Sequence, residues 1–151
     1  MKKFATLRFL LAIMALAMVL LSFISVFIHT FFNVVSIALQ EIIIYLHATV
    51  FMLGVAYTYW HDKHVRIDVF YQNFSERKKK RVNLLGSLFL LLPFFIFLFY
   101  SSYSYVISSW QKLEGSAEPG GLPAVFLLKS LLLALPALMV LLVLVQLFRN
   151  K

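Results

Sequence analysis

Histidine and carboxylate side chains in or beside apolar segments are the residues of this chain that could do chemistry. His29 and His47 each lie in a long apolar segment, and imidazoles on two neighbouring helices could ligate a haem iron from both sides. No further motif accompanies the pair, so we interpret both as residues for packing or for hydrogen bonds between helices. A haem-binding membrane anchor of a respiratory complex stays open as an alternative.

A second group with ligand chemistry is formed by His61, Asp62 and His64. It lies in a basic, hydrophilic segment and lacks the fourth ligand that a closed zinc site requires. We expect these side chains to face lipid headgroups or to cap a helix. We therefore predict no metal site and no bound cofactor.

Glu41 is the acidic residue that comes nearest to the interior of an apolar segment. A carboxylate inside a membrane span often marks a coupling or substrate site. This one stands near the beginning of its segment, where water and headgroups solvate a charge, so we expect a contact to a neighbouring helix or subunit. The chain shows no Ser/His/Asp arrangement, no phosphate-binding loop and no paired acids, and we predict that it is not an enzyme and has no catalytic residues.

Four long apolar segments must position these residues. The chain is 62% hydrophobic and 13% charged, so lipid must be its main solvent. A helix of about 20 residues crosses the roughly 30 Å of hydrocarbon in a bilayer. The sequence predicts an all-α membrane protein, with one domain of four transmembrane helices over residues 1–151. The predicted spans are approximately residues 9–32, 37–59, 84–105 and 122–148.

The positive charges indicate how the four spans are oriented. Every Lys and Arg except Lys112 and Lys129 lies at the N-terminus, between the second and third spans, or at the C-terminus. With four spans these three regions share one face, and the positive-inside rule makes that face, with both termini, cytoplasmic. We interpret the net charge of +8 as a topology signal, with contacts to anionic membrane lipids as a second role and no nucleic-acid partner.

The hydrophilic segment between the second and third spans has a pattern of its own. Val65, Ile67, Val69, Phe70 and Phe74 alternate with polar residues, which predicts a segment that lies along the membrane surface and contains a short interfacial helix. Asp68 would cap a short helix over residues 69–73, and Ser75 would cap the next one. The cations of residues 77–81 would then form the first turns of the third membrane helix.

Single residues inside the spans add local predictions. Gly54 stands among large residues and predicts a close helix contact. Pro93 removes one backbone hydrogen bond and predicts a kink. Pro123 fits the first position of the fourth helix, and Lys129 lies close enough to the end of that helix to snorkel.

Membrane topology does not explain every residue of the stretch His64-Val65-Arg66-Ile67-Asp68-Val69. The cations orient the spans, but Asp68, two positions after Arg66, adds nothing to that orientation. Its order with the other features resembles the small membrane subunit, of the DctQ type, of tripartite ATP-independent periplasmic (TRAP) transporters. The resemblance covers nearly the whole chain. The further residues that carry it are Ser75 and the basic segment after it, Trp110, the turn Pro119-Gly120-Gly121-Leu122-Pro123, Glu41 and Gly54.

This resemblance implies a small permease subunit in the bacterial inner (cytoplasmic) membrane, crossing it several times. Such a subunit pairs with a large membrane subunit that holds the substrate and sodium sites, and a periplasmic binding protein delivers the solute, often an organic acid. Ion gradients drive uptake, and the small subunit extends the fixed scaffold. The residues that we expect at the interface with the partners are Glu41, Gly54, His64, Arg66, Asp68, Trp110, Pro119, Gly120 and Gly121.

A small multidrug exporter is a further alternative, since that class also has four helices and one essential Glu. Such exporters carry the Glu well inside their first helix. The first apolar segment of this chain contains no acidic residue. The placement of Glu41 in the second segment therefore disfavours an exporter.

Overall fold

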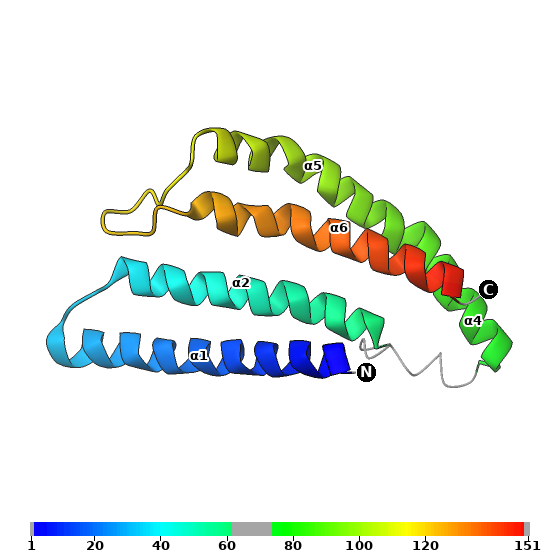
Figure 1. The fold of residues 1–151 in the computed structure, drawn as a ribbon, viewed down its shortest axis with the longest axis horizontal. Coiled ribbons are helices and arrows are strands. Elements are labelled where there is room, and N and C mark those ends of the chain that lie inside the picture. The colour runs from blue at the N-terminus through cyan, green and yellow to red at the C-terminus, as the bar shows by residue number, and fades with distance from the viewer. Residues whose placement is uncertain (1, 62–73, 150–151) are drawn as a thin grey trace. The chain divides into compact units, whose positions relative to one another are not determined.

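The computed structural model describes residues 2–61 and 74–149, and all of its regular structure is helical (Figure 1). The prediction of an all-α fold is confirmed for this part of the chain. The elements are α1 (Lys2–Phe32), α2 (Ile37–Trp60), α4 (Glu76–Gly86), the π-helical segment η1 (Ser87–Leu91), α5 (Leu92–Gln111) and α6 (Val125–Arg149).

Among residues 2–61 and 74–149, four helical stretches are long and apolar enough to cross a membrane, as the sequence predicts. They are Thr6–Phe32, Ile37–Trp60, Arg77–Gln111 and Val125–Phe148. The third is longer than predicted because α4, η1 and α5 follow one another without a break. The basic residues 77–81 therefore form the first turns of this continuous helix, in agreement with the prediction.

Contacts divide the chain into two compact units. The first comprises Met1–Gly54 and Val106–Leu131, and the second comprises Val55–Tyr105 and Leu132–Lys151. In the first unit, α1 and the first part of α2 run antiparallel and are joined by the short connection 33–36 (Figure 1). In the second unit, the greater part of α5 runs antiparallel to the second part of α6.

The helix that contains Pro93 adapts to it by changing its hydrogen-bond register. Leu92 donates its N–H to the carbonyl of Ser87, five residues earlier, and this bond closes the π segment η1. Pro93 has no N–H, so the helix interior cannot keep a complete set of α-type bonds at this point. The π segment lies just before Pro93, and the predicted kink stays a prediction. At the start of the same helix, Ser75 occupies the N-cap position, but its side chain makes no capping hydrogen bond.

The fourth helix begins at Val125, two residues later than the predicted first position at Pro123. Its first N–H groups explain the difference. Phe126 donates to the carbonyl of Glu114 at 3.2 Å, and Leu127 donates to that of Ala124 at 3.0 Å. The preceding loop, rather than a proline in the first turn, therefore supplies the acceptor for the beginning of α6.

The second unit is built around an apolar core. Ala56 and Tyr59 of α2 pack with Phe95 of α5 and with Met139 and Val143 of α6, and both α6 side chains are almost completely buried. Beside this core, the hydroxyl groups of Tyr59 and Ser87 lie 3.5 Å apart. Packing of apolar side chains is thus the main interaction that holds this unit together.

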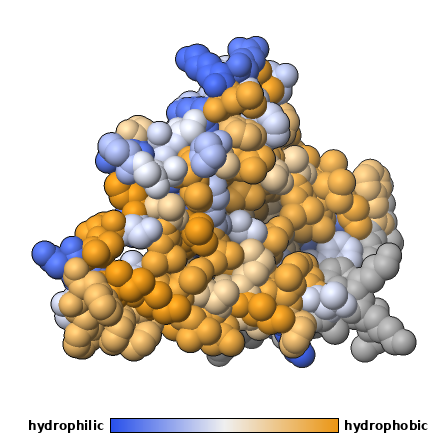
Figure 2. Space-filling view, turned by 60° about the vertical axis from the view of Figure 1, so that its left-hand side comes forward, coloured by the Kyte–Doolittle hydropathy of each residue, from blue (hydrophilic) through white to orange (hydrophobic). Residues whose placement is uncertain are grey.

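Large apolar side chains also cover much of the exterior. Apolar residues dominate the face shown in Figure 2. On α1, Phe9, Phe23 and Phe31 are about two-thirds exposed, at 67%, 68% and 70%. An exposed apolar area of this size is unfavourable in water but matches hydrocarbon. The exterior therefore fits a membrane protein.

Candidate functional site

Glu41 lies near the start of α2 and binds the loop between α5 and α6 (residues 112–124). Its carboxylate accepts a hydrogen bond from the hydroxyl of Ser116 and a second one, at 2.6 Å, from the backbone N–H of Leu122. We call this set of three residues the Glu41 latch. The sequence predicted a contact of Glu41 to a neighbouring helix or subunit, whereas the structure shows a contact to a loop of the same chain.

The loop folds back on itself around the latch. Ser116 donates its N–H to the carbonyl of Leu122 at 2.9 Å, and Gly121 donates to that of Glu118 at 3.1 Å. Gly120 has φ +81°, a backbone conformation that glycine adopts without strain. The Pro-Gly-Gly sequence therefore forms the turn that the sequence predicts.

Gly121 is required for a different reason, which is space. A Cβ atom at this position would overlap the side chain of Ser116 and would lie 2.8 Å from Oε1 of Glu41. Any side chain here must displace the residues of the latch. The glycine thus allows the loop backbone to come close to the carboxylate.

An ion pair joins the same loop to α6. Nζ of Lys129 lies 2.5 Å from Oε2 of Glu114, and this ammonium group, as hydrogen-bond donor, lowers the pKa of Glu114 below its usual value. The Lys129 side chain is the more buried partner, at 14% exposure against 39% for Glu114. The expected snorkelling of Lys129 therefore ends in a contact with a carboxylate.

Trp110 links the end of α5 to the beginning of α6. Its indole N–H donates to the hydroxyl of Ser130 at 2.7 Å, and its ring packs edge-on against Phe126 at a centroid distance of 4.8 Å. The indole nevertheless remains 44% exposed. Trp110 thus contributes to the packing of the chain itself and still offers surface to a partner.

The other predicted interface residues stand apart from this cluster. A Cβ atom at Gly54 would meet no atom of the described residues within 4 Å, and the close helix contact expected there stays a prediction. Pro119 is exposed on the loop. His64, Arg66 and Asp68 lie outside the described residues, as does the predicted interfacial helix, and their roles stay predictions.

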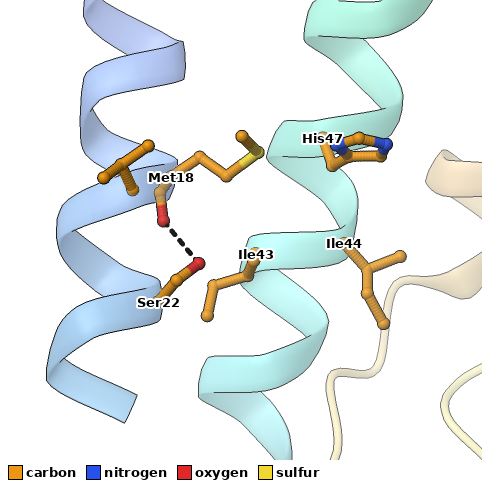
Figure 3. A pocket seen from close by; sticks show the side chains of 6 residues that line it. Met18, Ser22, Ile43, Ile44 and His47 are labelled. Carbon is orange, nitrogen blue, oxygen red and sulfur yellow. Dashed lines mark hydrogen bonds between the residues drawn. The ribbon is translucent and has the colours of Figure 1, made fainter. Parts of the chain in front are cut away.

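The two histidines considered for haem differ in their surroundings. His47 lines an apolar pocket between α1 and α2, together with Met18, Val19, Ser22, Ile43 and Ile44 (Figure 3). His29 does not line this pocket. In the part of the chain that the structure describes, no group of three or more His, Cys, Asp or Glu side chains is placed to hold a metal ion.

The arrangement positions a loop. Glu41, Glu114 and Lys129 are engaged by hydrogen bonds, and those bonds fix the loop of residues 112–124 against the starts of α2 and α6. Sequence reasoning singled out Glu41 and the Pro-Gly-Gly turn but missed Ser116 and Ser130. No sequence pattern predicts the hydrogen-bond partner of a serine in a loop or in the first turn of a helix.

The comparison with family models shows one match. The model of the DctQ component of tripartite ATP-independent periplasmic transporters matches residues 18–150. The searches of curated proteins and of solved structures gave no match. Because the match covers well over half of the chain, from the middle of α1 to the end of α6, the chain belongs to the DctQ family of TRAP transporter components.

Proposed function

We propose that this small permease subunit acts as a scaffold for the large membrane subunit of its TRAP transporter. The large subunit would carry an organic acid, delivered by a periplasmic binding protein and driven by an ion gradient. In this proposal the chain is a single four-helix membrane domain with both termini in the cytoplasm. Family membership supports the subunit's place in such a system.

The positions of the charged residues carry the proposal. A carrier needs polar groups near the bilayer midplane to bind its solute. In the described spans, the charged residues are Arg8, Glu41, residues 77–81 and Lys129, all close to a helix end. The middle of every described span is therefore free of charged side chains, which favours a supporting role over conduction.

The exposed surface supports a role that depends on other chains. In α1, the most apolar stretch of 18 residues contains no residue that the described part of the chain buries, and the same is true of the most apolar stretch of α2. Helices that bury so little of their own surface gain specificity only from lipid or from other membrane subunits. We propose that Gly54, with the open space around it, is one place where the large subunit approaches closely.

The α5–α6 loop is the surface that we propose for the periplasmic binding protein. Trp110, Pro119 and Gly120 are exposed there, while the Glu41 latch and Gly121 hold the loop in shape. A surface that is fixed before binding loses less conformational entropy when a partner docks. On the other face of the membrane, His64, Arg66 and Asp68 would contact the large subunit.

Reconstitution into vesicles tests the proposal. Four preparations are compared, each with labelled organic acid and a sodium gradient. Three contain the binding protein, together with this subunit alone, with the large subunit alone, or with both subunits. The fourth contains both subunits without the binding protein. We expect uptake only with both membrane subunits and the binding protein. Uptake by this subunit alone would overturn the scaffold role, and full uptake by the large subunit alone would show that no scaffold is needed.

A further inference from the structure

The pocket between α1 and α2 is a groove with one polar side chain that makes no hydrogen bond to the described residues. It has a volume of about 400 Å³ and is lined by Met18, Val19 and Ser22 of α1 and by Ile43, Ile44 and His47 of α2. Ser22 donates its hydroxyl to the carbonyl of Met18 in its own helix at 2.8 Å (Figure 3). The hydroxyl proton of Ser22 is therefore used within its own helix, whereas the imidazole of His47 makes no such bond in this α1–α2 groove.

The surroundings of His47 give it no hydrogen bond. The imidazole is exposed and stacks on Phe51, with a centroid distance of 6.4 Å, and in residues 2–61 and 74–149 no donor or acceptor lies within bonding distance of its ring nitrogens. His47 comes ten residues after Ile37, the first residue of α2. At 1.5 Å per residue this is about 15 Å along the helix, close to half of the hydrocarbon thickness.

A polar ring at this depth needs a partner that lipid cannot supply. Acyl chains carry no donor or acceptor, and a polar group left without a bond in hydrocarbon is strongly unfavourable. Hydroxyl, amide and histidine side chains in membrane helices are accordingly used to bond across helices. An occupant of the groove must therefore combine apolar bulk with one hydrogen-bonding group.

We propose that the α1–α2 groove seats a transmembrane helix of the large membrane subunit, which fills it with an apolar side chain and bonds to His47. This inference rests on the proposed function, since it takes the large subunit as partner. Ile43 and Ile44, beside His47 in Figure 3, form the apolar wall against which the incoming side chain packs. The groove thus assigns one surface of this chain to the subunit interface.

Photocrosslinking at two matched isoleucines tests the position of the interface. Ile44 lines the groove and is 53% exposed, whereas Ile24 on α1 does not line it and is 44% exposed. The two lie at similar distances from the 33–36 connection, eight residues before the end of α1 and seven after the start of α2. Each is replaced by the photoreactive amino acid p-benzoylphenylalanine, and the variants are produced together with the large subunit and irradiated in membranes.

We expect a covalent adduct with the large subunit from position 44 and none from position 24. Adducts with phospholipid alone at position 44 would overturn the proposal, because lipid would then occupy the groove. Adducts of equal yield from both positions would overturn it as well, since the groove would have no special place in the interface.

Substitution of the imidazole tests the hydrogen bond. In His47→Phe the ring stays but the bond is lost, and we expect roughly threefold to fifteenfold weaker recovery of the complex, the range for one hydrogen bond between membrane helices. His47→Gln keeps donor and acceptor groups and should restore most of it. Unchanged recovery with His47→Phe would contradict the proposal.

Two controls separate the possible failures. The thermal unfolding of each His47 variant without the large subunit should stay close to that of the wild type, because the His47 imidazole makes no hydrogen bond to the described residues. Wild-type protein must co-purify with the large subunit; if it does not, the proposed function fails. If it does and position 44 gives no adduct with that subunit, only the groove proposal fails.

Discussion

The α5–α6 loop and the core of the second unit are held together by different forces. The loop is fixed by hydrogen bonds and an ion pair at Glu41, Ser116 and Lys129. The core consists of apolar side chains around Met139 and Val143. In a bilayer, apolar helices gain little from one another compared with lipid, so their association depends on close packing. The polar loop, in contrast, depends on a few hydrogen bonds and one ion pair, so the loss of one of these interactions should destabilise the loop without destabilising the core.

Met139→Ala should give the largest effect and would sharpen this contrast. Met139 is 1% exposed and lies in the core, so truncation leaves a cavity, for which about 2–5 kcal/mol is the range measured in soluble proteins. Thermal unfolding in detergent micelles measures the change. Leu141→Ala, at a position that is 57% exposed, is the matched control and should leave the midpoint almost unchanged. Equal shifts for both variants would show that packing does not dominate this core.

Gly121→Ala should rank second and act on the loop. Its methyl group would overlap Ser116 and approach Glu41, and overpacking of this kind costs about 1–3 kcal/mol. Gly120→Ala is the comparison, because its Cβ would meet nothing within 4 Å and only the left-handed backbone opposes it, at about 1 kcal/mol. The unfolding midpoints of the two variants are compared. A larger loss for Gly120→Ala would mean that backbone conformation, not space, governs the turn.

Glu41→Gln should have a smaller and local effect. The amide keeps one acceptor oxygen and loses the charge, so at least one of the two bonds to Ser116 and Leu122 weakens. Hydrogen–deuterium exchange measures this: the Leu122 amide, which donates to Glu41, should exchange faster. Amides around Val143 should keep their rates. Faster exchange in both places would indicate global destabilisation and contradict a local latch.

The pH dependence of the Glu114–Lys129 pair should be the smallest effect. Because the lysine lowers the pKa of Glu114, the pair stabilises the fold above the usual pKa of a glutamate, about 4.3. This contribution is lost as the pH falls through the lowered pKa. The exposure of Glu114 limits its size. Unfolding midpoints measured between pH 6 and pH 3 should fall less steeply in Glu114→Gln, and parallel curves for the two proteins would refute the role of this pair.

Much of the fold follows from local properties of the sequence. Segment length and hydropathy predicted four spans that agree with the helices, and the start of α2 at Ile37 was predicted at the same residue. The observed helix ends differ most from the predicted ones where features other than hydropathy decide how far the helix extends. The third span gains residues at both ends, because cations can extend a helix beyond the bilayer and the polar segment after Tyr105 continues as helix.

The site was less predictable because its contacts are distant in sequence. Glu41 was expected to contact a neighbouring helix or subunit. Its partners in the structure, Ser116 and Leu122, lie 75 and 81 residues further along the chain. Periodicity describes which face of a helix is apolar and says nothing about such pairs. At Pro93 a local rule predicted a kink, and the structure has the π segment η1 just before this residue.

The separation between the two ends of the Glu41 latch also sets an order of events during synthesis. A ribosome that adds roughly 5–20 residues per second reaches Leu122 about 4–16 s after Glu41, which lies 81 positions earlier. During that interval the carboxylate must rely on water or on lipid headgroups, because its backbone donor does not yet exist. The loop can take its final shape only when the last hairpin has been inserted, so truncated chains that end before residue 116 should lack it altogether.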